Sequence, residues 1–223
     1  MKIKAAIFDM DGTLVDSLMV WDVLWRKFGI KFLHDETFHP SEEDDKAVRT
    51  LSLKDAMELI HQKYAIGASG AELLDAANEL IAEFYRNDVQ LKPGALEWLQ
   101  HCKNNGVKMC IASATAPDLV SMAIEHCGIG EYFAKIFSCS EIGKGKDQPD
   151  IYIMAKEFFG YSSEETWVFE DSHIAIETAH GIGLKTVGIY DKYNFGQDQM
   201  RKIADEYIDD GESLMKLVKK DFT

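Results

Sequence analysis

A chain of 223 residues, of which 46% are hydrophobic and 28% charged, can bury a core without the help of disulfides or a structural metal. Its formal net charge is −14, from 24 Lys and Arg against 38 Asp and Glu, so the average surface repels nucleic acid and anionic lipid. Neither is therefore an expected partner, and a site for an anionic substrate would need local positive charge from lysines, helix N-termini or a metal.

The N-terminus and the cysteines indicate a cytoplasmic protein. The first apolar run breaks at Asp9, too early for a signal peptide, and no apolar run reaches the roughly 18 residues of a membrane-spanning helix. The cysteines lack C-x-x-C spacing, and we expect all of them to be unpaired structural thiols: Cys102, Cys110, Cys127 and Cys139.

In chain order, the first expected element is a buried strand over residues 3–8. Residues 17–87 then show helical periodicity and no convincing strand, with apolar stripes that begin near Trp21, Leu53 and Leu73. This pattern predicts a helical bundle inserted after the first strand, with the Trp and Met side chains in its core. Asp16 and Ser17, just before the first stripe, could contact a substrate, but we expect such a residue to cap a helix.

From about residue 91 onward, short apolar strands alternate with amphipathic helices that stop at glycines. The expected strands cover residues 107–112, 135–138, 167–169 and 186–189, and the expected helices cover residues 93–105, 117–127, 149–159 and 172–181. Such alternation predicts an α/β fold with a doubly wound parallel sheet, whose ligand site lies beyond the carboxyl ends of the strands. We expect this core to comprise residues 1–17 and 88–223, and the helical domain to comprise residues 18–87.

Two carboxylates, Asp9 and Asp11, directly follow the first strand, and Gly12 then lets the chain turn sharply. Holding two negative charges near one point is costly unless something binds there. A divalent cation would relieve the repulsion, and one of the carboxylates could then act as a nucleophile.

Other strand ends add polar groups at the same edge of the predicted sheet. Ser113 follows one strand and Glu170-Asp171 follow another, while the loop 143–146 offers Lys144 and Lys146. Together these residues offer a site for a hard cation, a hydroxyl group and an ammonium group. Such groups around a bound phosphate suit phosphoryl transfer.

With these residues, the sequence resembles the haloacid dehalogenase superfamily. Within it, the sequence is similar to the phosphatases and β-phosphoglucomutases that have a Rossmann-like core and a helical cap after the first motif. The resemblance covers essentially the whole chain. It is carried by Asp9-x-Asp11-Gly12-Thr13, Ser113, Lys146 and Glu170-Asp171, in the order of the family.

The resemblance implies a role for each of these residues. Asp9 would be the nucleophile that forms an aspartyl-phosphate, and Asp11 would be the general acid and then the general base. Mg²⁺ would be held by the Asp9 carboxylate, the Asp11 backbone carbonyl and Asp171. Ser113 and Lys146 would bind the phosphate, with Lys146 also neutralising charge on Asp9.

The sequence departs from the usual pattern of the family at two points. The lysine motif reads Lys146-Asp147-Gln148-Pro149, and Lys144 competes for the role, although Lys146 has the spacing of the family to the following proline. Ala114 stands where many relatives have a polar side chain, so that phosphate would be bound there, and near Gly12, by backbone N–H groups.

Three residues keep two interpretations each. Glu170 is either an outer partner of the metal or an exposed residue at a strand end. Arg49 and Lys54, in the helical insertion, could meet a second anionic group of the substrate or belong to a solvated helix face, so we assign them no role.

We expect a Mg²⁺-dependent phosphatase, a monomer, that hydrolyses a small phosphorylated metabolite such as a sugar phosphate or phosphoglycolate. The first alternative is a β-phosphoglucomutase-like phosphomutase, for which residues 18–87 show no recognisable sugar-binding set. The second alternative is a non-catalytic module that binds Mg²⁺ and carries a phospho-aspartate, for which Asp11 would not be needed. The sequence names neither the substrate nor, beyond this expectation, the oligomeric state.

Overall fold

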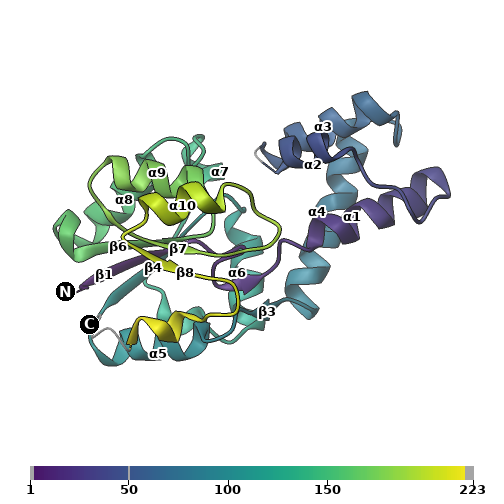
Figure 1. Cartoon of the computed structure of the whole chain (residues 1–223). Helices are drawn as coiled ribbons and strands as arrows, with labels where there is room; N and C mark the ends of the chain where they lie inside the picture. The colour runs from purple at the N-terminus through teal and green to yellow at the C-terminus, as the bar shows by residue number, and fades with distance from the viewer. Residues whose placement is uncertain (1–2, 50, 219–223) are drawn as a thin grey trace. The chain divides into compact units, whose positions relative to one another are not determined.

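The computed structural model describes residues 3–49 and 51–218, and the chain divides into two compact units (Figure 1). One unit comprises Met1–Leu18 and Val89–Thr223, and the other comprises Met19–Asp88. The first unit contains both β-sheets, and the second is helical.

A six-stranded sheet with the order β5-β4-β1-β6-β7-β8 forms the centre of the first unit, and all of its neighbouring strands are parallel. Its strands are β1 (Ala5–Phe8), β4 (Lys108–Ser113), β5 (Ile136–Ser138), β6 (Thr166–Glu170), β7 (Lys185–Ile189) and β8 (Glu206–Ile208). The predicted α/β fold with a doubly wound parallel sheet is confirmed. The order reverses at β1, between β4 and β6, which is where such sheets place their ligands.

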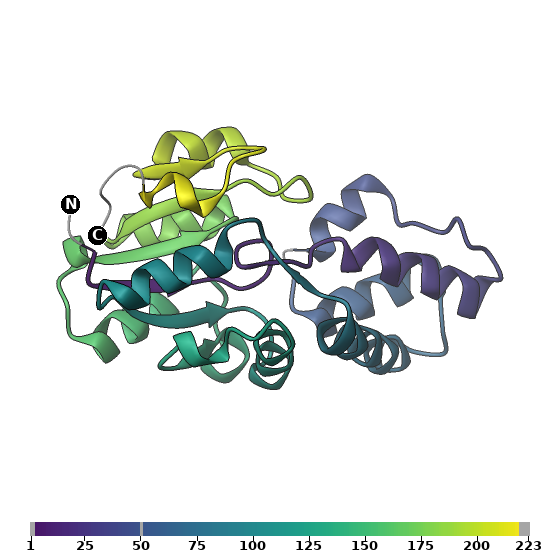
Figure 2. The ribbon, with the colours of Figure 1, turned by 90° about the horizontal axis from the view of Figure 1, so that it is seen from below.

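Helices cover both faces of this sheet, with α8, α9 and α10 over one face and α5 over the other (Figures 1 and 2). The helices of this unit are α5 (Ala95–Asn104), α6 (Pro117–His126), α7 (Cys139–Ile142), α8 (Asp150–Phe159), α9 (His173–Gly181) and α10 (Gln197–Ile203). Single 3₁₀ turns are η2 (Gly130–Tyr132), η3 (Ser163–Glu165) and η4 (Leu214–Lys216).

Alternate residues of the central strands fill the two apolar layers, as the two-residue period of a strand requires. Ile7 and Val168 pack with Tyr152 of α8 in one buried cluster. Phe8 stacks on Phe169 with ring centroids 4.4 Å apart. Burial on both faces explains why these strands read as continuous apolar runs.

A two-stranded antiparallel ribbon, β2 (Val15–Asp16) with β3 (Gln90–Leu91), lies where the chain leaves and re-enters the first unit. The helical unit between them comprises α1 (Val20–Phe28), the π-helical turn η1 (Gly29–Leu33), α2 (Glu42–Val48), α3 (Leu53–Tyr64) and α4 (Gly70–Asn87). Trp25 and Met57 are fully buried in its core. The serines Ser41, Ser52 and Ser69 cap α2, α3 and α4.

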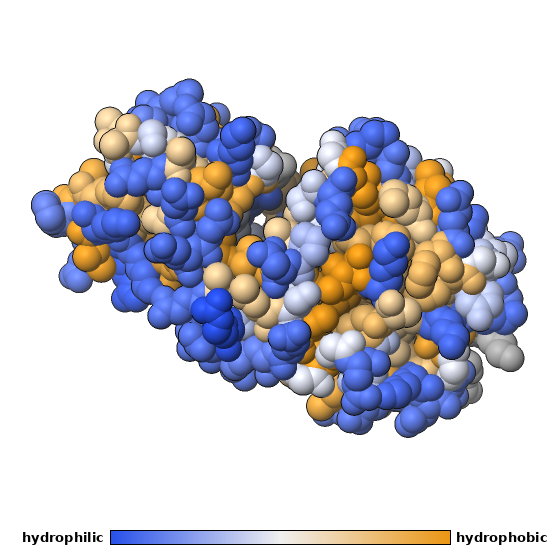
Figure 3. Space-filling view, turned by 180° about the vertical axis from the view of Figure 1, so that it is seen from behind, coloured by the Kyte–Doolittle hydropathy of each residue, from blue (hydrophilic) through white to orange (hydrophobic). Residues whose placement is uncertain are grey.

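Hydrophilic residues cover much of the molecular face seen in Figure 3, and apolar side chains gather there in separate patches. Among the described residues, no helix is both long and apolar enough to cross a bilayer. All four cysteines, Cys102, Cys110, Cys127 and Cys139, are free thiols.

Candidate active site

The carboxyl edge of the sheet brings together the polar residues that follow three central strands. Phe8 pairs with Phe169, so the residues that follow them, Asp9 and Glu170, lie level with each other on β1 and β6. The backbone N–H of Asp9 continues this ladder by donating to the carbonyl of Phe169 at 2.9 Å. Ser113 ends the other neighbouring strand, β4.

Three buried carboxylates form a cluster at this edge. Asp9, Glu170 and Asp171 are 6%, 1% and 3% exposed, and one oxygen of each lies within 4.8 Å of the others. Oxygen ligands gathered out of water suit a hard divalent cation, which would compensate their mutual repulsion. Burial at 1% also rules out the interpretation of Glu170 as an exposed strand end.

Lys146 supplies positive charge to the cluster. Its ammonium donates to Asp9 and, at 2.5 Å, to Glu170 Oε1, and its side chain is only 13% exposed. Lys144, by contrast, pairs with Asp150 at 2.6 Å, and its side chain is 52% exposed. The geometry therefore places Lys146, and not Lys144, beside the acidic residues.

Burial and charge shift the pKa values of these groups. Burial raises the pKa of Asp9 well above its usual range, and the charge of Lys146 opposes this rise. Burial lowers the pKa of Lys146, but the charges of Asp9 and Glu170 outweigh burial and raise it, so that the ammonium keeps its proton. Burial and the charge of Glu170 raise the pKa of Asp171 to about 7. The acidic cluster thus favours the binding of cations or protons.

Contacts on both sides hold the Asp171 carboxylate. The hydroxyl of Thr13 donates to its Oδ1 at 3.0 Å, and the amide of Asn194 donates to its Oδ2 at 2.8 Å. Gly12 lies against the same carboxylate, with φ +74°, and a Cβ at this position would stand 2.2 Å from Oδ2. Both the close approach and the positive φ therefore require glycine at this position.

The Asp11 carboxylate binds two hydroxyl groups rather than joining the acidic cluster. Ser17 Oγ donates to its Oδ1 at 2.6 Å, and Thr115 Oγ1 donates to its Oδ2 at 2.8 Å. The predicted capping role of Ser17 is wrong, because α1 begins at Val20 with Met19 as its N-cap. A carboxylate held by hydroxyls beside the cluster is suited to proton transfer.

Ser113 shapes the turn that follows β4. Its side chain is buried, and its Oγ accepts the backbone N–H of Thr115 at 3.0 Å, so that Ala114 lies inside a tight turn. Ser138, at the end of β5, braces this turn by donating to the carbonyl of Thr115 at 2.8 Å. Within the described part of the chain the Ser113 hydroxyl proton has no acceptor, which leaves it free to bind an anion.

Three residues of this edge are absent from the sequence prediction. Thr115 lies two positions after Ser113, and Asn194 lies in the loop after the strand predicted at residues 186–189. Tyr152 of α8 donates to Glu170 Oε1 at 3.3 Å, but in the sequence it is one of several apolar positions of a helix. For Thr115 and Asn194, the sequence offered one signal, namely that both follow predicted strands and therefore lie near the carboxyl edge of the sheet.

Arg49 and Lys54 belong to the helical unit. The guanidinium of Arg49 pairs with Asp45 at 2.9 Å and with Asp22 at 3.5 Å, and its side chain is 11% exposed. Lys54 is exposed on α3. Arg49 is thus held by acidic residues of its own unit.

Known proteins resemble this chain along most of its length. A family model described as haloacid dehalogenase-like hydrolase matches residues 3–183. The protein CbbY of Rhodobacter capsulatus is 28% identical over 207 residues, which are 89% of this chain and 90% of that protein. The phosphorylated carbohydrates phosphatase of Thermotoga maritima is 22% identical, with coverage of 87% and 88%.

A solved structure shares the fold. CbbY from Rhodobacter sphaeroides, in complex with phosphate, has a TM-score of 0.77 at 22% identity, with 92% of this chain and 93% of that chain covered. The match of the family model to residues 3–183 confirms the family resemblance seen in the sequence.

Proposed function

The chain belongs to the haloacid dehalogenase-like hydrolases, and we propose that it is a Mg²⁺-dependent phosphatase that acts on a small phosphorylated metabolite of the sugar phosphate type. The observation that carries this proposal is the buried carboxylate of Asp9, which directly follows β1 and lies against both Lys146 and the carboxylates of Glu170 and Asp171. A relative named as a phosphorylated carbohydrates phosphatase supports the substrate class.

The donor set fits Mg²⁺. Three buried carboxylates offer hard oxygen ligands. Burial, and then the charges of the neighbouring carboxylates, raise the pKa values of Asp9 and Asp171, and the single lysine only partly opposes this rise. By the family resemblance Asp9, the Asp11 carbonyl and Asp171 would be the ligands, with Glu170 as their neighbour. The bound ion would withdraw charge from the phosphate and screen it from the carboxylates.

Asp9 is the proposed nucleophile. One of its oxygens attacks phosphorus, the bond from phosphorus to the leaving oxygen breaks, and the phosphoryl group is held on Asp9 as an acyl phosphate. Lys146 stabilises the negative charge on Asp9 and on the phosphoryl oxygens, and Ser113 donates its hydroxyl proton to one of these oxygens.

Asp11 is the proposed acid and base. It gives a proton to the leaving oxygen and then takes one from the water that attacks the aspartyl-phosphate, so that the net reaction is hydrolysis. Ser17 and Thr115 orient its carboxyl for these steps, because each donates to a different oxygen and leaves further lone pairs accessible. These hydroxyls therefore define the resting position of the acid.

The test is phosphate release from a panel of sugar phosphates and phosphoglycolate, with Mg²⁺ and with EDTA, while sugar 1-phosphates are followed for isomerisation. We expect Mg²⁺-dependent release that Asp9→Asn abolishes, with the melting temperature in EDTA retained. Glu164→Gln is the matched control, because this exposed carboxylate lies in η3 before β6 begins, at the opposite edge of the sheet. Isomerisation without release would instead indicate a mutase, and neither activity would indicate a non-catalytic module.

A further inference from the structure

The loop between β7 and α10 sends one side chain, Asn194, into the acidic cluster. Its Nδ2 donates to Asp171 twice, to the main-chain oxygen at 3.1 Å and to Oδ2 at 2.8 Å. An amide NH₂ group has two hydrogens, so both bonds can form together. Because one bond holds the backbone and the other the carboxylate, the pair fixes the direction in which Asp171 points.

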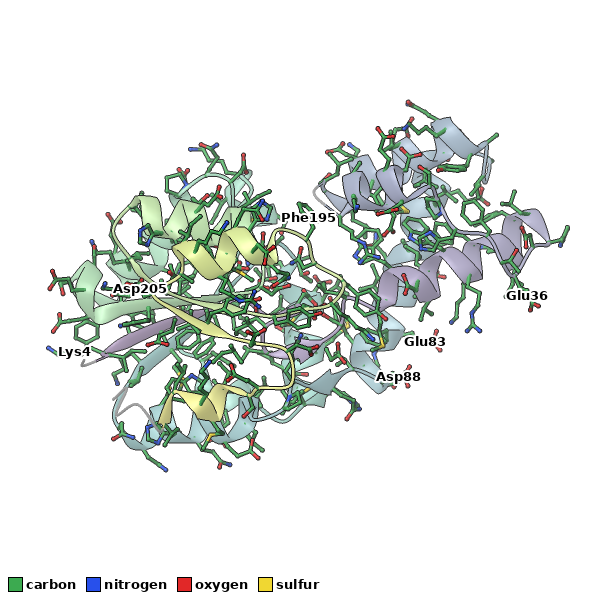
Figure 4. All side chains as sticks on the ribbon, in the orientation of Figure 1. Lys4, Glu36, Glu83, Asp88, Phe195 and Asp205 are labelled. Carbon is green, nitrogen blue, oxygen red and sulfur yellow. The ribbon has the colours of Figure 1, made fainter. Side chains whose placement is uncertain are left out.

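The loop orients Asn194 in turn. Its Oδ1 accepts the backbone N–H of Phe195 at 3.1 Å, which identifies the other end of the amide as the donor. Figure 4 labels Phe195 on this loop. Gln197 adds a brace, since its Nε2 donates to the carbonyls of Asp191 and Asn194 at 3.1 and 3.2 Å. The amide is therefore held in place by contacts within the loop itself.

A buried ion pair anchors the start of this loop. Asp191 is 2% exposed, its Oδ2 accepts from Lys92 at 2.5 Å, and its Oδ1 accepts the backbone N–H of Tyr193 at 2.8 Å. Lys92 comes from the segment after β3, so the loop is tied to a distant part of the same unit. Removing either partner would leave a charge with little access to water, so the two residues are expected to stay paired.

The chemistry of the donors matters as much as their positions. Thr13 and Asn194 each give one neutral hydrogen bond to a different oxygen of Asp171. A carboxylate oxygen has further lone pairs, so a cation can still bind. A neutral donor orients the carboxylate and leaves its negative charge available, whereas a lysine there would compete with the cation.

We propose that Asn194 is a positioning residue of the divalent-cation site and that it holds the Asp171 carboxylate toward Asp9 and Glu170. The inference rests on the proposed function, which supplies the cation. Loss of such an outer partner typically lowers metal affinity by about 10–100-fold. The same loss is expected here, since without the amide the Asp171 side chain can leave the orientation in which it faces the cluster.

The test measures cation binding by the full chain without substrate, with Mn²⁺ as the probe, by electron paramagnetic resonance and calorimetry. We expect Asn194→Ala, and Asn194→Leu, which keeps the branched shape but has no donor, to raise the Kd for Mn²⁺ by about 10–100-fold. The melting temperature in EDTA should change little. Phosphate release should need more cation but approach the wild-type kcat at saturation. Asn105→Ala, at the exposed end of α5, is the matched control.

Two results would overturn the inference. One is a wild-type Kd for Mn²⁺ in both Asn194 variants, and the other is a wild-type protein that binds no Mn²⁺, because there would then be no cation site to position. If the wild-type protein binds Mn²⁺ but releases no phosphate, that result would contradict the proposed function and not the inference about Asn194. The Kd values of the variants would still decide for or against the role of Asn194.

Discussion

At the scale of single residues, the candidate site gathers charged side chains where water has little access. Three carboxylates and one ammonium share the carboxyl edge of the sheet, and each group is largely buried. One ammonium leaves the negative charge in excess, and this excess is the physical reason for the divalent cation that we propose here.

Lys146 should matter far more than its neighbour Lys144. Lys146→Met removes the charge that stabilises Asp9 and the phosphoryl oxygens, and we expect kcat/KM to fall by about 100-fold or more. Lys144→Met is the matched control, because it breaks only an exposed pair with Asp150, whose charges water screens. Steady-state rates of both variants check this, and equal losses would contradict the assignment.

At Gly12, the effect of backbone strain can be separated from the effect of a steric clash with Asp171. Gly12→Ala and Gly106→Ala both place a side chain at φ +74°, so backbone strain alone should cost each of them about 1–2 kcal/mol of stability. Only at Gly12 does the new Cβ collide with the Asp171 carboxylate, since a Cβ on Gly106 meets nothing within 4 Å. Cation affinity should therefore fall only in Gly12→Ala, as titration with Mn²⁺ would reveal, and a similar fall in both variants would count against the collision.

The raised pKa of Asp171 predicts how stability depends on pH. Its value rises from an ordinary 3.8 to about 7, so over this range the folded protein holds a proton that the unfolded chain has released. The stability of the metal-free protein should therefore fall as pH rises through this window. Mg²⁺ competes with that proton, so the rise in Tm on adding Mg²⁺ should be larger at about pH 8 than at about pH 5.5.

Thermal melts in EDTA and in Mg²⁺ across this range check the prediction. Asp171→Asn is the control, because it removes this titrating group and should weaken the dependence on pH, while Asp9, whose pKa is also raised, still contributes. A Mg²⁺ effect that grows toward acid pH would contradict the assignment of the cation to these carboxylates.

At the scale of elements, the sequence predicted what depends on local pattern. Buried strands read as short β-branched runs and helices ended at glycines, so the five predicted strands of the sheet are confirmed. Neither β8, at the edge of the sheet, nor the ribbon of β2 and β3 was predicted. Strands of two or three residues are too short to show a recognisable alternation of apolar and polar residues. Their formation depends on partners distant in the chain.

The same limit explains which parts of the site escaped prediction. Asp9, Ser113 and Asp171 follow recognisable strands, and sheet topology gathers residues in such positions at one edge. Asn194 belongs to a loop whose course is set by the ion pair of Asp191 with Lys92, and no local pattern reveals such a contact. Tertiary contacts that decide a side chain's direction are thus the part that sequence reasoning cannot supply.

At the scale of the whole molecule, the helical unit is an insertion into the first unit, and it does not divide the proposed site between the two units. All of the residues proposed to act on phosphate or to hold the cation lie in the first unit. The insertion begins and ends at paired strands, since Asp16 of β2 is opposite Gln90 of β3, so a short linker can replace it.

Replacing residues 19–88 by a short Gly-Ser linker should give a folded core that still binds Mn²⁺. We expect phosphate release to fall while the Kd for Mn²⁺ stays within about threefold, because the cation ligands are unchanged. Circular dichroism and Mn²⁺ titration check this. A core that folds but loses Mn²⁺ binding would show that the helical unit contributes to the cation site.

The central claim is that Asp9 accepts the phosphoryl group, and trapping the intermediate tests it most directly. Mg²⁺-loaded enzyme is mixed with the best substrate of the panel, quenched in acid and reduced with borohydride, and the modified residue is located by peptide mass spectrometry. We predict conversion of Asp9, and of no other carboxylate, to homoserine, and no conversion in EDTA. Phosphate release without modification of Asp9, or modification of a different residue, would contradict the account.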